Sequence, residues 1–384
     1  MINKSLSFSP ANISHIFAIT IFFIFGILWH ATGYSLLAPA TLAAALIIAT
    51  VAIPKVATKN IVIVALTAIA FFSGNLRYAQ QLHMQKHFFA QTNNKTFDIK
   101  ATVQDIQKTE GKITPFCTTL YIKKIRESKH KISWKKLGKT IQIYTFKPLK
   151  LQVADKVKVK NITFKKPKNE EFAAYLIKKN IAATLFESNL SYKILYRPNY
   201  SLKRWLYQKK QNILNSLKRK MSRKLFTIFA SLFLGNKTIC KKDVDKVKTK
   251  FKAWGILHLL ARSGLHLILF LLICEFILRC VPLYFFIKQI IMILLSILYL
   301  ALSWPSISFI RAFSVLLFYK ACPLLNTKPD LIHIVATVCF AMLLYNPIQL
   351  FFLDFQLSFL LTFTLAIFSK IQIKRKRKYK INNK

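Results

Sequence analysis

Long apolar blocks alternate with lysine-rich stretches along the whole chain, and this alternation limits the fold more than any other feature. Eight blocks come near the length of about 20 residues that a helix needs to cross a bilayer. A soluble domain cannot easily combine 54% hydrophobic residues with a formal net charge of +46. We therefore predict a polytopic α-helical membrane protein with about eight transmembrane helices, at residues 14–31, 36–53, 60–74, 253–278, 283–302, 306–322, 330–345 and 350–369.

The basic residues of the short loops predict the orientation of these helices. With the N-terminus in the cytoplasm, the loop with Lys55 and Lys59 lies inside, as do the later basic loops and the tail of residues 371–384. Short cytoplasmic loops are enriched in lysine and arginine, whereas long domains cross the membrane largely regardless of charge. This indicates a multi-pass membrane protein with both termini in the cytoplasm and residues 77–252 outside.

Residues 77–200 lack long apolar runs and show the alternation of β-strands. We predict strands at residues 97–106, 116–125, 140–146, 156–164 and 181–186, with one helix around Phe172–Leu176. Several short strands with one helix favour an external small β-barrel of OB type. The predicted organisation is thus N-terminal membrane helices (1–76), this external domain (77–200), a basic amphipathic connector (201–252), a second membrane domain (253–370), which the resemblance described below implies to be a channel, and a basic tail (371–384).

The charge balance, 59 Lys plus Arg against 13 Asp plus Glu, has two explanations. An AT-rich genome enriches lysine, but it does not account for the shortage of acids. The alternative is a polyanionic partner, either nucleic acid or anionic lipid headgroups. For a nucleic-acid strand, the aromatic residues that could stack on bases are Phe97, Phe116, Tyr121, Trp134, Tyr144 and Phe146.

Polar residues inside the predicted helices are candidates for a transport pathway, because ionisable groups at membrane depth are costly and usually face a cavity or a partner. The densest group is His258, Arg262, Ser263, Gly264 and His266. Further along the chain stand Arg311, Gln356 and Ser358. Each could instead bond neighbouring helices, and Arg311 could reach the membrane surface.

No catalytic or metal-binding pattern accompanies these residues. The sequence has no P-loop, no GxSxG motif and no cysteine or histidine spacing of a metal site. We therefore expect a protein that is not an enzyme and that uses no cofactor or metal.

Several short elements, in their order along the chain, resemble ComEC-type competence proteins, the inner-membrane channels of bacterial DNA uptake. The most specific is HLLARSGLH, His258–His266. Supporting elements are GNLR at residues 74–77, residues 169–183, LG at 234–235, Ser306 to Arg311-Ala312, YNP at 345–347 and FQLSF at 355–359. Three positions depart from the family pattern: Arg262 replaces an apolar residue, while Ala154 and Asp354 stand where glycine is common.

The resemblance implies a channel component that passes single-stranded DNA into the cytoplasm during natural transformation, in a form without the metallo-β-lactamase-like domain of fuller family members. Its implied partners are single-stranded DNA, the lipid bilayer, a periplasmic DNA receptor, a separate nuclease and a cytoplasmic helicase, and a homo-oligomer is left open. Two alternatives remain at this point: a permease for a small solute or a metal, and a truncated, non-functional family member.

Overall fold

A computed structural model describes residues 10–33, 58–92, 95–108, 115–128, 133–165, 167, 169–187, 190–235, 241–255, 264–304 and 306–382 of the chain. The chain divides into two compact units. The first, here called the helical unit, comprises Met1–His83, Pro282–Ile293 and Arg311–Lys384. The second, the sheet unit, comprises Met84–Val281 and Leu294–Ile310.

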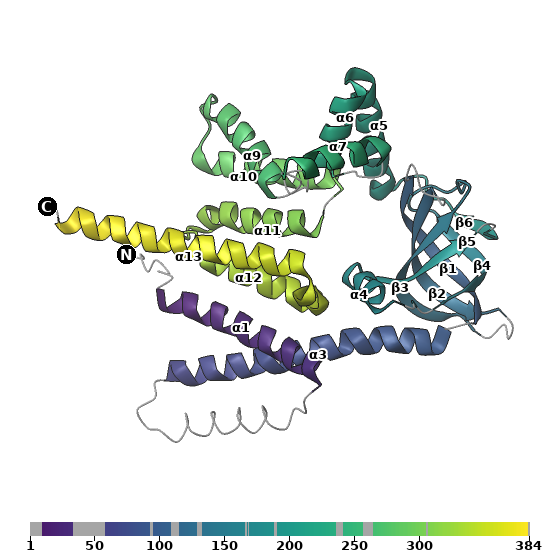
Figure 1. Ribbon diagram of the computed structural model, residues 1–384, viewed down its shortest axis with the longest axis horizontal. Coiled ribbons are helices and arrows are strands. Elements are labelled where there is room, and N and C mark those ends of the chain that lie inside the picture. The colour runs from purple at the N-terminus through teal and green to yellow at the C-terminus, as the bar shows by residue number, and fades with distance from the viewer. Residues whose placement is uncertain are drawn as a thin grey trace. The chain divides into compact units, whose positions relative to one another are not determined.

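The helical unit has its own apolar core, built from helices at the two ends of the chain. Its elements are α1 (Pro10–Thr32), the first part of α3 (Thr58–Thr92), the start of α10 (Phe285–Leu302), most of α11 (Ile307–Ala321), η1 (Cys322–Leu325), α12 (Leu331–Tyr345), η2 (Pro347–Phe351) and α13 (Leu353–Asn382). Phe23 and Ile27 of α1 are fully buried among residues of α12 and α13, including Val335, Leu343 and Phe355. Helices α1, α12 and α13 lie alongside one another in Figure 1.

Two glycines allow α1 and α3 to approach each other closely. A Cβ atom added at Gly26 would lie 2.0 Å from the carbonyl oxygen of Phe71, and one added at Gly74 would lie 2.3 Å from that of Phe23. Small residues at such crossings are common in membrane proteins, where van der Waals packing holds helices together. Gly74 therefore lies at a helix crossing. The sequence had indicated a short helix that ends at this residue, but the helix continues beyond it.

Among the described residues, four helices are long and apolar enough to cross a membrane: Val62–Thr92, Phe285–Leu302, Ser308–Leu325 and Leu353–Gln372. Ile16–Thr32 and Leu331–Tyr345 are shorter apolar helices. The structure thus supports a helical membrane protein, but the prediction of eight spans is not supported among the described residues. The predicted span 36–53 and part of 253–278 lie outside those residues. Where the sequence predicted a span of 60–74, α3 continues for 18 further residues, to Thr92.

The sheet unit contains six strands, and the five predicted strands are confirmed. They are β1 (Thr96–Lys108), β2 (Phe116–Glu127), β3 (Lys135–Thr145), β4 (Lys156–Thr163), β5 (Ile181–Glu187) and β6 (Tyr192–Tyr196), with α4 (Glu170–Lys178) between β4 and β5. The strand order is β5-β3-β2-β1-β4-β6, with β3 and β5 parallel and the other pairs antiparallel. The expected closed barrel is not supported: the described strands form one open mixed sheet, with β5 and β6 at its edges.

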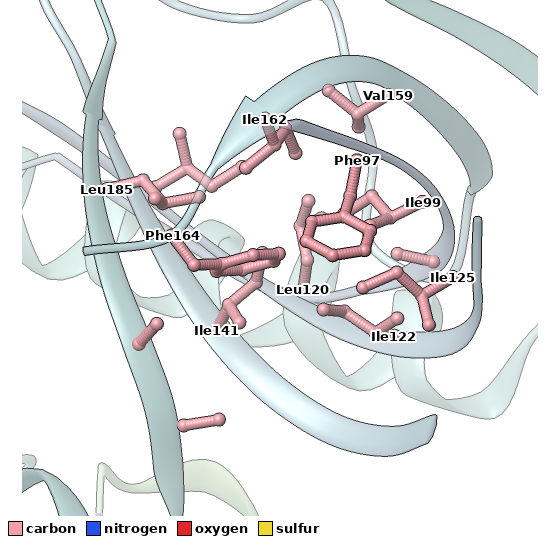
Figure 2. Packing of buried hydrophobic residues seen from close by; sticks show 14 of the residues in the cluster. Phe97, Ile99, Leu120, Ile122, Ile125, Ile141, Val159, Ile162, Phe164 and Leu185 are labelled. Atoms are coloured by element: carbon pink, nitrogen blue, oxygen red, sulfur yellow. The ribbon is translucent and has the colours of Figure 1, made fainter. Parts of the chain in front are cut away.

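The sheet curves around a core of aliphatic and aromatic side chains, which point toward one another from the strands (Figure 2). Ile99, Leu120 and Ile141 are fully buried there. Register shifts in β1, at Lys100/Ala101 and Val103/Asp105, explain the curvature, because bulges bend a strand and increase its twist. The inward positions alternate with outward ones, so the outer face of the sheet is left to polar side chains.

A buried carboxylate attaches the connector to the sheet. Asp155 is inaccessible to solvent, and it accepts hydrogen bonds from Arg197 Nη2 at 2.9 Å and from Arg204 Nη2 at 2.6 Å. Arg204 lies on α5 (Leu202–Lys220), whose Tyr207 hydroxyl donates to the carbonyl of Ile106 on β1. One face of this basic helix is therefore packed against the sheet, and the unit continues with α6 (Arg223–Leu232), α7 (Lys241–Ala253) and α9 (Gly264–Arg279).

The turn before β4 contains a strained alanine. Ala154 has a φ of 74°, a conformation that costs a residue with a Cβ roughly 1 kcal/mol and costs glycine very little. This is the position where the sequence departs from the glycine of the resembling family. We expect Ala154→Gly to raise the melting temperature of the purified protein, by an amount equivalent to about 1 kcal/mol. An unchanged or lower melting temperature would show that the strain is compensated elsewhere.

Candidate nucleic-acid interface and membrane motifs

The outer face of the sheet carries a row of lysines that crosses five strands. Lys193 of β6 lies opposite Lys158 of β4, which lies opposite Lys100 of β1; Lys100 lies opposite Lys124 of β2, and Lys124 opposite Lys136 of β3. Residues directly opposite on antiparallel strands share a face and lie about 5 Å apart. We call these five residues the lysine row. Like charges directly opposite each other destabilise a sheet, so the lysine row is a candidate site for an anionic partner.

Trp134 contacts two lysines of the row and a neighbouring arginine. The ammonium of Lys100 lies 4.5 Å from the centroid of the Trp134 ring, that of Lys158 lies 5.6 Å away, and the guanidinium carbon of Arg126 lies 4.9 Å away. Cations are attracted to the face of an aromatic ring. The indole therefore offsets some of the repulsion between the cations, and its ring is already in contact with three of them.

A buried acid completes the cluster. Asp98 accepts a hydrogen bond from Arg126 Nη2 at 3.0 Å and lies 3.9 Å from Lys158 Nζ. Burial raises the pKa of the Asp98 carboxyl, but the hydrogen bonds from Arg126, the Asn161 backbone and Ser128, together with the charge of Lys158, outweigh burial and hold the pKa below its ordinary value. Asp98 is therefore ionised at neutral pH and fixes the positions of its cationic neighbours.

The lowered pKa of Asp98 predicts an acid-sensitive sheet. A carboxyl with a depressed pKa in the folded state contributes stability above its unfolded pKa, and this contribution is lost as the pH falls through the folded pKa. We expect part of the loss of stability below about pH 4 to depend on Asp98. Thermal unfolding of wild type and Asp98→Asn between pH 7 and pH 3 measures this: the difference in melting temperature should shrink on acidification. A difference independent of pH would contradict the assignment.

The predicted stacking residues are not equivalent in the structure. Phe97 is buried in the core, and Trp134 contacts cations. Tyr144 stacks on Phe186, with ring centroids 5.0 Å apart, and burial together with Cys117 and Tyr175 raises the pKa of its hydroxyl. Phe116 and Tyr121 are partly buried, whereas Phe146 is 49% exposed and Phe186 is 67% exposed. Sequence reasoning missed Phe186, although its alternate position on β5 marked it as facing outward.

Two of the motifs lie near the end of α10 within the sheet unit: LG, at residues 234–235, and SGLH, the last four residues of HLLARSGLH. The Trp304 amide donates to the Leu234 carbonyl at 2.8 Å, and the Tyr299 hydroxyl donates to the Phe233 carbonyl at 2.7 Å. The His266 ring packs edge-on against Phe233, with centroids 5.5 Å apart. The LG element, the SGLH element and the segment after α10 are therefore neighbours. Of the other predicted pathway residues, Gly264 begins α9, while His258, Arg262 and Ser263 lie outside the described residues.

Lys210 of α5 joins this group of motifs, and sequence reasoning missed it. Its ammonium donates to the Ser303 carbonyl at 3.0 Å and lies 5.1 Å from the ring centroid of Trp304. Burial lowers the pKa of Lys210, and the charge of Asp105 acts in the opposite direction. The signal in the sequence was weak, because Lys210 is one of many lysines on a basic helix.

In the helical unit, Arg311 is buried, and its guanidinium contacts α13. It is 3% exposed, its Nη2 donates to the carbonyl of Asp354 at 2.6 Å, and its guanidinium carbon lies 5.6 Å from the rings of both Phe355 and Phe359. These contacts join α11 to the FQLSF element of α13. In that element, the Gln356 amide donates to the Leu350 carbonyl, and the Ser358 carbonyl accepts from Thr362, so the described contacts of both residues are local.

Two further elements meet at the end of α12. Arg77 donates to the carbonyl of Leu344 from Nε at 3.1 Å and from Nη2 at 3.0 Å. Gln81 donates to the Asn346 side chain at 2.7 Å and accepts from the Ile348 amide at 3.2 Å. GNLR and YNP, more than 260 residues apart, are thus held together by hydrogen bonds to helix-terminal backbone groups, which otherwise lack partners.

Comparison with known protein families concerns the part of the chain that contains most of these motifs. Residues 232–384 match the family described as Competence protein. This part of the chain is similar to the competence-protein family. The matched region contains the LG, SGLH, YNP and FQLSF elements, so the resemblance drawn from those motifs is confirmed for this part. No curated protein and no solved structure matches the chain.

Among the described residues, no group of three or more His, Cys, Asp or Glu could hold a metal ion. The described contacts in the competence-family part are buried polar contacts and aromatic packing. The roles of the predicted pathway residues stay predictions.

Proposed function

We propose that the protein is an inner-membrane channel component that moves single-stranded DNA into the cytoplasm during natural transformation. The observation that carries this proposal is the competence-family match of residues 232–384, in a chain whose described part includes four helices long and apolar enough to cross a membrane. We infer conduction without a chemical reaction, driven by partners such as a cytoplasmic helicase, and a multi-pass arrangement with both termini in the cytoplasm.

The sheet unit supports the same proposal. An external domain that receives DNA needs positive charge, because neutralisation of phosphates dominates the affinity of proteins for nucleic acids. The lysine row provides this charge on one face. The order β5-β3-β2-β1-β4 also resembles that of OB domains, which bind single strands, although the described strands do not close a barrel.

Transformation frequency tests the proposal. Deletion of the gene should reduce transformation to background, and the wild-type gene should restore it. We expect His266→Ala and Arg311→Ala to restore it only in part, because each removes contacts between motifs of the competence-family part. His87→Ala, which changes an exposed side chain outside that part, is the matched control. Immunoblots of the membrane fraction must show equal amounts of each variant.

The outcomes separate the alternatives. Normal transformation after deletion would contradict DNA uptake and favour a non-functional family member. Loss of uptake of a small solute or metal, with normal transformation, would instead indicate a permease.

A further inference from the structure

The lysine row extends farther than one binding contact requires. Neighbouring strands are about 4.8 Å apart, so five strands place its ends roughly 19 Å apart, measured along the sheet. The row runs across the strands, and each member faces the same side as its neighbours. Such a line of cations matches a linear polyanion better than it matches a single small anion.

The acids near the row are already engaged. Asp98 is paired with Arg126 and lies near Lys158, and Glu127 lies 3.8 Å from Lys95. Three cations around Trp134, less the charge of Asp98, leave a local net charge of +2. The register adds Lys124 and Lys193 beside them. The face therefore keeps a positive surplus after its internal ion pairs are formed.

The surroundings of Trp134 bear on whether this face recognises the bases or the phosphates of a nucleic acid. An aromatic residue in a basic surface usually predicts stacking on bases. Here the ring is in contact with Lys100, Lys158 and Arg126, so a base would compete with these cations for the ring. The contribution of the indole is therefore to hold these cations in position.

We propose that the lysine row is a track for the backbone phosphates of a nucleic-acid strand, and that Trp134 holds its cations in place without stacking on bases. This inference rests on the proposed function for the identity of the strand. It adds that recognition is directed at phosphates and is therefore independent of base sequence. The chemical class of the ligand is a phosphodiester chain.

The test measures binding and does not depend on transport. Full-length protein in nanodiscs of zwitterionic lipid is titrated with a fluorescent thymidine oligonucleotide and with an abasic oligonucleotide of equal length, over a range of salt concentrations. The row variant carries Lys100→Met, Lys124→Met and Lys158→Met. The matched control carries Lys147→Met, Lys179→Met and Lys220→Met, at exposed positions outside the row. Melting temperatures identify any variant that fails to fold.

We expect the abasic and thymidine strands to bind alike. The slope of log affinity against log salt should become shallower by about 0.7 for each row lysine removed, or about 2 for the row variant, with a much smaller change in the control. Trp134→Leu, a single change that leaves all lysines in place, should weaken both oligonucleotides equally.

Several results would overturn the inference. Unchanged affinity and salt slope in the row variant would show that the phosphates bind elsewhere. Loss of binding with the abasic strand alone would show that bases are recognised. If the row variant loses only the capture of phosphatidylglycerol vesicles, the row binds lipid headgroups. Failed transformation with intact oligonucleotide binding would instead contradict the proposed function while leaving the phosphate track in place.

Discussion

Gly26→Ala is expected to separate α1 from α3 and to destabilise the helical unit severely. The new Cβ would lie 2.0 Å from the Phe71 carbonyl oxygen and 3.1 Å from the Asn75 amide nitrogen, and both are backbone atoms that cannot rotate away. Overpacking of this kind costs about 3 kcal/mol where the surroundings cannot adjust. Because Phe23 and Ile27 on the same helix are buried against α12 and α13, displacement of α1 also opens the core. Fluorescence-detected size exclusion of heated, detergent-solubilised protein measures the loss.

Gly33→Ala is the graded control for this change. No atom lies within 4 Å of a Cβ added at Gly33, but its φ of +77° still penalises alanine by about 1 kcal/mol. Gly26→Ala should therefore lower the melting temperature clearly more than Gly33→Ala does. Equal effects would mean that the close crossing of α1 and α3 does not contribute to stability.

Asp155→Ala should detach the connector helix from the sheet. The carboxylate is buried with two arginines around it, and its removal leaves the guanidinium of Arg204, which is 11% exposed, without its anionic partner. Breaking a buried ion pair by removing one member costs about 3 kcal/mol or more. Limited proteolysis of the full-length protein should show new cleavage around α5, and the melting temperature should fall.

Glu127→Ala is the control for Asp155→Ala. Glu127 pairs with Lys95 at 3.8 Å at a more exposed site, where an ion pair contributes less than about 1 kcal/mol. A proteolytic pattern of Asp155→Ala that matches wild type would show that other contacts of α5, such as the hydrogen bond from Tyr207 to Ile106, are sufficient to hold the helix.

The sequence predicted local structure well and pairing poorly. The alternation of apolar and polar residues predicted five strands, because the two sides of a strand have different surroundings. The helical spacing of Phe172, Tyr175 and Leu176 predicted α4. Eight spans are not supported among the described residues, where Ile16–Thr32 and Leu331–Tyr345 are shorter apolar helices. Hydropathy also does not show where a helix continues past its apolar part, and α3 extends through polar residues to Thr92. Strand alternation also could not show that the sheet stays open, because closure depends on which edges meet.

For the candidate sites too, the sequence indicated local features but not which distant residues meet. The motifs were recognised, but their contacts were not, since Arg77 and Leu344, or Phe233 and Tyr299, are brought together only by the fold. The lysine row was hidden for a similar reason. Each lysine is one of many in a basic chain, and only the register of β6, β4, β1, β2 and β3 places five of them in line. The stacking role predicted for Trp134 was likewise drawn without knowledge of its neighbours.

The packing of α1 against α12 has a consequence for biosynthesis. Thr20 donates to the carbonyl of Ala336, so a contact in this core spans 316 residues. At a synthesis rate of about 5–20 residues per second, α1 waits on the order of tens of seconds before its partner leaves the ribosome. During this interval its glycine face can be covered by α3, which follows soon after, but its α12 face cannot. Among the described helices, α1 is therefore made early but has its packing completed late, and any factor that shields apolar helices during synthesis would act on it throughout this interval.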